Sequence, residues 1–482
     1  MSELRRRDFR LIPGANQDNS LLLDDREPAK ERRQTHTKTL DYSSGTSVVE
    51  QRQDLEPKLA KKRFRTFRIL VTFFGTSHTR SELGYVELDE ELKAQELERA
   101  STQLGFALKL LVVLLVLVGA AMVLSTSFVP SLGAKGTGSP FAIFERQLLW
   151  IMAGLAAFFI VSRLNPKRLA PYARLMIIPV ILLLLLVLVP GVGVAVSGSS
   201  RWVGFSFLRI QPSEAAKLAV VLYLAGFLTP AVPERLRSLR AVFPAIWLVG
   251  LAAFLVLAEP DMGTSLVLGT ILLGVFFLAG MRMRIYIPFV LTTVTLAIVA
   301  AFYEPYRRQR LLSFLHPWQN RLADSYQEVQ GLVAFATGGT TGVGLGAGSA
   351  KWGYLPNSQT DFIFAILGQE AGFIGCMVVL AALVALCVVV MRIGLRAGSR
   401  FEYLLCAGVA IWIGSQTAFN VGAVLGVFPV TGVPLPLISA GGSSLTILLV
   451  SLGLVYGVAR RPGQVFAVGN SKKHNRAKHS VS

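Results

Sequence analysis

Residues 354–391 read YLPNSQTDFIFAILGQEAGFIGCMVVLAALVALCVVVM. From Phe362 onward this stretch is long and apolar enough to cross the hydrocarbon core of a bilayer, which is about 30 Å thick. Asp361 stands at the mouth of the expected helix, and Glu370 follows about 13 Å further along it at the rise of an α-helix. Charges are costly at membrane depth, so Asp361 is a functional candidate and Glu370 should be neutral or paired. Thr360 and Asp361 would equally well form an ordinary helix N-cap.

The rest of the chain has the same character and predicts an all-α integral membrane protein. Of its 482 residues, 52% are hydrophobic and 16% are charged. We expect about ten transmembrane helices, since several other apolar runs of about 18 or more residues can span a bilayer. Residues 104–460 form the membrane domain, with a large extracytoplasmic loop at 304–361 between the seventh and eighth helices. The expected spans are 104–126, 145–163, 168–190, 211–230, 241–258, 261–280, 285–303, 362–391, 402–426 and 437–459.

Polar segments flank the membrane domain on both sides. Residues 1–103 begin with roughly 60 polar residues of mixed charge, as expected of a largely disordered cytoplasmic arm. Within this arm, residues 61–75 mix basic and aromatic side chains and form either an interfacial helix at the inner leaflet or a flexible basic linker. Residues 87–99 read as a charged helix that leads into the first span, and residues 461–482 form a basic cytoplasmic tail.

The distribution of Lys and Arg predicts the orientation of the spans. The connections near 259–261 and 427–436 carry no Lys or Arg, whereas the connections expected on the other side are basic. By the positive-inside rule, both termini face the cytoplasm. Residues 1–103 hold 19 basic and 18 acidic residues, so the net charge of +19 resides almost wholly in residues 104–482. That excess faces anionic lipids at the inner surface, and no nucleic-acid partner is expected.

The loop at 304–361 is far longer than most connections in a compact domain, and loops of this length are usually functional or disordered. We expect it to fold back over the membrane domain. Its segment 338–348 reads GGTTGVGLGAG. Such glycine-rich backbone either forms a flexible connector or approaches a bulky ligand or an anion closely.

Several charged residues near the expected outer face are candidates for binding or catalysis. Glu214 and Lys217 share a helix face and form either a structural ion pair or, with Arg209, a cationic site suited to a diphosphate. Asp261 follows a tight outer turn and fits a helix N-cap. No His lies in an expected span, which disfavours a Ser-His-Asp site or a zinc cage in the bundle. A carboxylate and cations here suit an anionic lipid-linked substrate with a general base, or equally an ion-coupled transporter.

In these motifs the chain resembles the SEDS family, the bacterial shape, elongation, division and sporulation proteins. The stretches that carry the resemblance are Arg201-Trp202, Arg209-Ile-Gln-Pro-Ser-Glu-Ala-Ala-Lys217, Glu259-Pro-Asp-Met-Gly-Thr-Ser, Tyr326-Gln-Glu-Val-Gln, Gly344-Leu-Gly-Ala-Gly-Ser, Tyr354-Leu-Pro, Thr360-Asp-Phe-Ile-Phe-Ala and Phe428-Pro-Val-Thr-Gly-Val-Pro-Leu-Pro-Leu-Ile-Ser-Ala-Gly-Gly-Ser-Ser444. They occur in the family's order across the membrane domain. Together they are highly specific, although any one alone would be weak.

The resemblance implies a ten-span peptidoglycan glycosyltransferase that polymerises lipid II at the outer face of the bacterial cytoplasmic membrane. It implies a cognate class B penicillin-binding protein as the cross-linking partner. The long cytoplasmic arms and the Lys351-Trp-Gly-Tyr-Leu-Pro segment favour the division (FtsW-like) branch over the elongation (RodA-like) branch, hence a septal location and divisome partners. The family's catalytic aspartate maps to Asp361, and its important basic residues map to Arg209 and Lys217. The remaining substrate-binding candidates are Arg201, Glu214 and Lys351.

The residues and the resemblance together suggest a mechanism. Asp361 would take the proton of the acceptor sugar 4-hydroxyl as that oxygen attacks the donor anomeric carbon with inversion. Arg209 and Lys217, with Arg201, would neutralise the departing diphosphate, and Glu214 would orient Lys217. No metal cage is visible, and a divalent cation (Mg²⁺ or Mn²⁺) on the diphosphate is left open. The alternatives are a lipid II flippase, disfavoured because the charges crowd towards the outer half, and a non-catalytic divisome scaffold.

Overall fold

The computed structural model describes residues 86–132, 139–191, 193–196, 199–205, 208–230, 238–319, 321–322 and 325–461. The expected arm up to residue 85, its segment 61–75 and the basic tail from 462 lie outside these residues. Residues 82–482 form one compact unit, and the description below concerns that unit.

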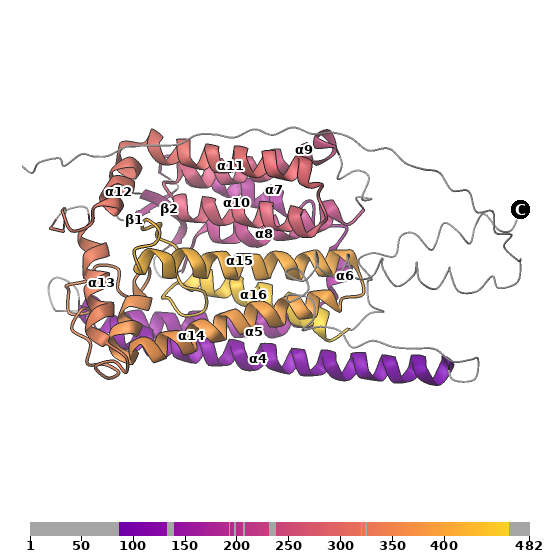
Figure 1. Ribbon diagram of the computed structural model, residues 1–482, viewed down its shortest axis with the longest axis horizontal. Coiled ribbons are helices and arrows are strands. Elements are labelled where there is room, and N and C mark those ends of the chain that lie inside the picture. Colours follow the sequence, from indigo (N-terminus) through magenta and orange to yellow (C-terminus); the bar gives the residue numbers. More distant parts are fainter. Residues whose placement is uncertain are drawn as a thin grey trace, which may run out of the picture. The chain divides into compact units, whose positions relative to one another are not determined.

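The unit is built of helices, as the sequence predicts, with one small sheet (Figure 1). The helices are α4 (Val86–Leu132), α5 (Ala142–Ser162), α6 (Pro166–Leu169), α7 (Ile177–Val187), α8 (Pro212–Leu228), α9 (Leu239–Ala258), α10 (Met262–Leu278), α11 (Met283–Tyr303), α12 (Pro305–Leu315), α13 (Tyr326–Gly338), α14 (Ile363–Leu395), α15 (Arg400–Val424) and α16 (Gly442–Ala459). The strands are β1 (Val194–Val196), β2 (Ser199–Phe205) and β3 (Leu208–Ile210), paired antiparallel in that order.

Seven of the described helices are long and apolar enough to cross a membrane. They are α4 over Glu98–Ser127, α5, α9, α11, α14, α15 and α16, and α7 and α10 are shorter apolar helices. Each of the ten expected spans overlaps a described helix, and how many of them cross the bilayer stays a prediction. The charged stretch at 87–99 is helical, as expected, and runs into the first span without a break, since α4 is continuous from Val86.

The burial pattern separates a central group of helices from an outer group. Helices α8, α15 and α16 bury most of their residues, including the large side chain of Trp412. Helix α11 buries only Ala301 and exposes Leu291, Leu296 and Ile298. An apolar helix with so little protein contact is stable only in an apolar solvent, so the lipid bilayer is expected to cover this face.

The segment between α11 and α14 contains two helices, α12 and α13, and then a turn-rich stretch. Helix α13 packs so closely on α14 that an added Cβ at Gly338 would collide with the carbonyl of Gly368. Helix α14 is kinked at Gly372, whose φ of 69° favours glycine. The glycine-rich stretch hydrogen-bonds around this kink, with Val343 N donating to Gln369 O at 3.0 Å. Its backbone packs on α14, and Gly346 N donates to the Glu370 carboxylate at 3.0 Å; the expected close approach to a bulky ligand stays a prediction.

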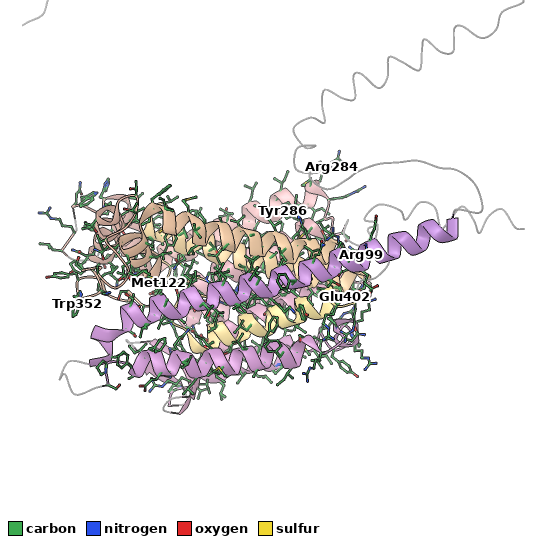
Figure 2. The ribbon with its side chains drawn as sticks, turned by 90° about the horizontal axis from the view of Figure 1, so that it is seen from below. Arg99, Met122, Arg284, Tyr286, Trp352 and Glu402 are labelled. Atoms are coloured by element: carbon green, nitrogen blue, oxygen red, sulfur yellow. The ribbon has the colours of Figure 1, made fainter. Side chains whose placement is uncertain are left out.

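The helices run side by side, and the two ends of the bundle differ in chemistry. Helices α12 and α13 and the strands lie at one end (Figure 1). Figure 2 shows Trp352 at that end, opposite Arg99 and Glu402. At the Glu402 end the basic connections come together: Lys167 lies 3.9 Å from Glu402, and Arg461 donates to the carbonyls of residues 163 and 164.

Candidate functional site

A cavity of about 440 Å³ opens among the ends of several helices. It is lined by residues from β2, the starts of α8, α10 and α16, the end of α11, helix α12, and the connections before α14 and α16. The polar and charged residues in its wall are Arg201, Gln211, Glu214, Asp261, Thr264, Arg310, Asn357, Thr360, Asp361, Thr431, Ser443 and Ser444. Three of the predicted site residues therefore meet in one cavity: Asp361, Arg201 and Glu214.

Asp361 belongs to the cavity and not to the helix that follows it. Helix α14 begins at Ile363 after Phe362, which makes no side-chain cap. The N-cap interpretation of Asp361 is therefore wrong for this structure. Its carboxylate lies on the cavity wall, where an added Cβ at Gly432 would sit 3.8 Å from Oδ2.

The main chain around Asp361 is held by groups from distant parts of the sequence. Asn420 Nδ2, in α15, donates to the carbonyl of Asp361 at 2.9 Å and to the carbonyl of Val433 at 2.8 Å. Ser439 Oγ donates to the carbonyl of Thr360 at 2.6 Å. These bonds fix the main chain of Asp361 and leave its carboxylate in the wall of the cavity.

The electrostatic surroundings of Asp361 suit a general base. Withdrawal of the carboxylate from water raises its pKa from 3.8 to about 6. Arg310 opposes this rise, Asp261 adds to it, and Arg201 and a hydrogen bond from Thr360 lower the pKa further. A carboxyl group with a pKa near 6 is ionised at neutral pH and is a stronger base than an ordinary aspartate.

The turn between α9 and α10 is organised by Asp261 and Arg201. Asp261 caps α10 by accepting from Thr264 N at 3.0 Å, as the sequence predicts, and also accepts from Gln211 Nε2 at 3.2 Å. Arg201 donates to the carbonyls of Glu259 and Pro260 at 2.9 and 2.6 Å. Its guanidinium therefore fixes this turn as well as bordering the cavity.

Glu259 is buried beside this turn. Neither carboxyl oxygen has a hydrogen-bond partner among the described residues. Burial, reinforced by the charge of Asp261 and opposed by Arg201, raises its pKa from 4.5 to about 8. Glu259 is therefore protonated at neutral pH.

Lys217 pairs with Glu214, which confirms the ion-pair interpretation. Its ammonium nitrogen lies 2.7 Å from the Glu214 carboxylate, 3.2 Å from Gln416 Oε1 and 5.3 Å from the centre of the Trp412 ring. The Lys217 side chain is 1% exposed and is not part of the cavity wall. Arg209, on β3 opposite Gly204, is also outside the wall, and its Nε is buried without a hydrogen bond among the described residues.

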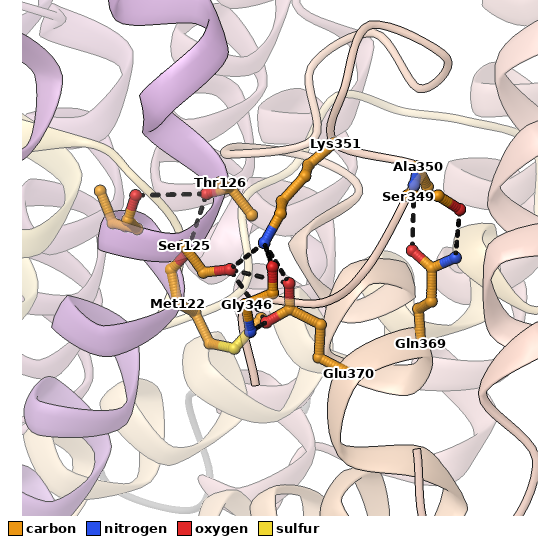
Figure 3. Close-up of polar contacts among 10 residues, drawn as sticks. Met122, Ser125, Thr126, Gly346, Ser349, Ala350, Lys351, Gln369 and Glu370 are labelled. Carbon is orange, nitrogen blue, oxygen red and sulfur yellow. Dashed lines mark hydrogen bonds and ion pairs between the residues drawn. The ribbon is translucent and has the colours of Figure 1, made fainter. Parts of the chain in front are cut away.

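Lys351 lies in a different polar cluster, shown in Figure 3. Its ammonium contacts Glu370 Oε1 at 2.7 Å, Ser125 Oγ at 2.8 Å and the carbonyl of Gly346 at 2.6 Å. Glu370 is paired, as the sequence predicts, and also accepts from Ser125 Oγ and Gly346 N. The cluster joins α4, α14 and the glycine-rich stretch, and the structure places it away from the cavity wall.

Arg310, Asn420 and Ser443 also belong to this site, and the sequence predicted no role for them, although Ser443 lies in the 428–444 stretch that carries the resemblance. Arg310 stands among other arginines of a long loop, and Asn420 and Ser443 lie inside or at the edge of apolar runs. Their positions follow from tertiary packing, which no local pattern reports. Among the described residues, no three His, Cys, Asp or Glu side chains gather into a group that could hold a metal ion.

Comparison with known proteins establishes the family. The family model of the FtsW/RodA/SpoVE cell cycle proteins matches residues 106–463. The chain belongs to that family. Among similar members is the probable peptidoglycan glycosyltransferase FtsW of Coxiella burnetii, 37% identical over 351 residues, or 72% of this chain and 93% of the relative. The FtsW of Nitrosococcus halophilus, which bears the same description, is 40% identical over 358 residues, or 73% of this chain and 90% of the relative.

Solved structures agree with this assignment to the FtsW/RodA/SpoVE family. A chain of a peptidoglycan synthase complex, studied for its coordination of polymerization and crosslinking, is 30% identical with a TM-score of 0.61. The match covers 74% of this chain and 97% of that one. The rod shape determining protein RodA of Thermus thermophilus is 28% identical with a TM-score of 0.55, over 74% and 97% of the two chains. Membership and the apolar helices together make this a multi-pass membrane protein.

Proposed function

We propose that this chain is a peptidoglycan glycosyltransferase that polymerises lipid II at the outer face of the cytoplasmic membrane during septal synthesis. The proposal is supported by its relatives, which are described as probable peptidoglycan glycosyltransferases FtsW. The observation that carries it is the placement of the Asp361 carboxylate in the wall of a polar cavity, with a pKa raised to about 6.

The reaction needs a base at the acceptor sugar. Asp361 accepts the proton of the acceptor 4-hydroxyl while that oxygen bonds to the anomeric carbon of the donor. The bond between that carbon and the diphosphate oxygen breaks with inversion, and undecaprenyl diphosphate leaves with the electron pair. General-base assistance of this kind accelerates such a step by about 10²- to 10⁴-fold.

The charged neighbours of Asp361 have separate tasks in this proposal. Arg310 faces the same cavity and favours the ionised base. Arg201 keeps the 259–261 turn in place through two backbone carbonyls. Glu214 holds Lys217 next to the cavity, so Lys217 acts on the substrate through the shape and field of the site. A divalent cation would enter as the counter-ion of the substrate diphosphate, and polymerisation with and without EDTA tests its need.

The partner and the cellular setting belong to the same proposal. A cognate class B penicillin-binding protein would cross-link the strands, as the similarity to a chain of a peptidoglycan synthase complex suggests. The basic connections gathered near Glu402 support a cytoplasmic placement of that end and of both termini. The cavity end would then face outward, where lipid II is consumed.

The test is strand synthesis from labelled lipid II by the purified full chain with its cognate partner. Glycan strands on a gel, formed while a β-lactam blocks cross-linking, are the expected result. Lipid II transfer across vesicle bilayers without strand formation would replace this proposal with a flippase. Neither activity, with partner binding intact, would make the protein a scaffold.

A further inference from the structure

Of the cations that the sequence offers for a diphosphate, Arg209 lies outside the cavity wall and the others already have partners. Lys217 is buried against Glu214, and Lys351 is buried against Glu370. Arg201 donates to two backbone carbonyls. Arg310 is a further cation in the wall, but a diphosphate accepts several hydrogen bonds at once, and the start of α16 offers additional donors.

Helix α16 begins at the cavity and has 18 residues, with Gly441, Ser443 and Ser444 in the cavity wall. The first N–H groups of a helix have no partner within it, and the helix dipole makes this end attractive to anions. Helix α10 opens on the same cavity but its start is capped by Asp261, and α8 carries Glu214 in its first turn. Helix α16 has neither a side-chain cap nor an acidic residue in its first turn.

An unpartnered hydroxyl at the same place points independently to a ligand. Ser443 is 3% exposed, borders the cavity, and its Oγ has no hydrogen-bond partner among the described residues. Thr431, another residue of the cavity wall, also has a buried Oγ1 without a hydrogen-bond partner among the described residues. Buried hydroxyls are normally hydrogen-bonded. Two unpartnered hydroxyls beside one cavity therefore indicate hydrogen-bond donors for a ligand that binds there.

The turn that presents these donors is rigidly built. Gln147 Oε1, from α5, accepts from Gly441 N at 3.3 Å. An added Cβ at Gly442 would collide with the indole of Trp150, so no side chain fits there. Glycines followed by a helix start let the backbone approach an anion closely, as in other phosphate-binding turns. These contacts hold the backbone of the turn in place beside the cavity.

We propose that the start of α16, residues 441–444, binds the diphosphate of a polyprenyl-linked sugar, with Ser443 Oγ and first-turn N–H groups as donors. The identity of the ligand rests on the proposed function. In the reaction the subsite would stabilise the negative charge that develops on the leaving diphosphate, while Asp361 acts on the acceptor from another part of the same wall.

The test measures binding separately from polymerisation. Farnesyl diphosphate, farnesyl monophosphate, farnesol and inorganic pyrophosphate are titrated against the purified full chain in detergent by calorimetry. The variants are Ser443→Ala, which removes the hydroxyl, and Ser444→Asp, which places a competing carboxylate at the helix start. Ser451→Ala is the matched control, because it lies on the same helix and its hydroxyl donates only to the carbonyl of Ile447.

Farnesyl diphosphate should bind more tightly than the monophosphate and far more tightly than farnesol. Its affinity should fall about 10-fold in Ser443→Ala, the scale of one hydrogen bond to a charged group, and further in Ser444→Asp. Ser451→Ala should bind as wild type. If Ser443→Ala and Ser444→Asp weaken pyrophosphate binding as they weaken farnesyl diphosphate binding, the subsite recognises the diphosphate alone. If they leave pyrophosphate binding unchanged, the subsite also needs the polyprenyl chain.

Equal affinity for farnesol and farnesyl diphosphate, or wild-type affinity in Ser443→Ala, would overturn the subsite. This outcome is separate from failure of the proposed function. If the wild type polymerises lipid II but the variants bind farnesyl diphosphate as the wild type does, only the proposed subsite is rejected. If the wild type makes no strands but its binding of farnesyl diphosphate depends on Ser443, the subsite stands and the glycosyltransferase function is rejected.

Discussion

At Asp361, the two largest effects on the strength of the base oppose each other. Removal of the carboxylate from water raises its pKa, and the Arg310 guanidinium pulls it down towards the ordinary value, leaving it at about 6. A base works only when ionised, so polymerisation should rise with pH through about 6 and level off above it. Initial rates of strand synthesis at saturating lipid II, measured between pH 5 and 8, give the midpoint.

Arg310→Gln should move that midpoint. Loss of the favourable charge raises the Asp361 pKa, so the acid limb shifts to higher pH by about 1 unit. Arg308→Gln removes the same charge from an exposed position on α12 and should leave the midpoint in place. A midpoint that moves equally in both variants, or in neither, would show that Arg310 does not tune the base.

Glu259 predicts a pH dependence of stability. Its folded pKa of about 8 lies above its ordinary value of 4.5, so the folded protein holds a proton that the unfolded chain releases. Stability from this group is fully present below pH 4.5 and is lost progressively as the pH rises to 8. Melting temperatures in detergent should fall over this window in wild type and fall less in Glu259→Gln. Parallel curves would contradict the assignment of a buried protonated carboxyl.

At the scale of elements, the Lys351–Glu370 pair links the kink of α14 to the glycine-rich stretch. Lys351→Met leaves a buried carboxylate without its cation and should destabilise the protein by about 3–5 kcal/mol. Lys351→Met combined with Glu370→Met removes both charges and should recover most of the loss. Thermal unfolding of the single and double variants decides this, and a double variant no more stable than the single one would argue against the pair.

Asn420 connects α15 to the backbone of Asp361. Asn420→Ala removes the donor to two buried carbonyls. The free energy of unfolding should fall by about 1–3 kcal/mol. Polymerisation should drop, with the lipid II KM nearly unchanged, because the base and not the binding surface is displaced. Thr417→Ala, one turn away with its hydroxyl bonded inside the helix, is the control. Equal activity of the two variants would remove this role from Asn420.

The sequence predicted elements well and their mutual placement poorly. Apolar length alone located a helix for each expected span, and the charge at Asp261 located the start of α10. The partner of Glu370 could not be assigned, because Lys351 reaches it only through the fold of a long loop. Arg310 has no local signal, and although Ser443 lies in the 428–444 stretch that carries the family resemblance, its neighbours in the cavity come from segments far away in the chain.

For the whole molecule, the chemistry gathers at one end of the bundle and the basic connections at the other. Residues of β2 and α12 line the cavity, and these elements lie with α13 at one end of the bundle (Figure 1), the end where Figure 2 shows Trp352. This separation was predictable from the Lys and Arg bias, because the charge rule needs no tertiary information. The shape of the cavity was not, since it is formed by residues between 201 and 444 that converge only in the folded chain.

The most direct test of the central claim compares wild type with Asp361→Asn in strand synthesis from labelled lipid II. Both proteins are purified with their cognate partner and matched for melting temperature and partner binding. We expect glycan strands from wild type and none from Asp361→Asn, because the amide cannot accept the acceptor proton. Equal strand synthesis by the two proteins would contradict the assignment of Asp361 as the catalytic base.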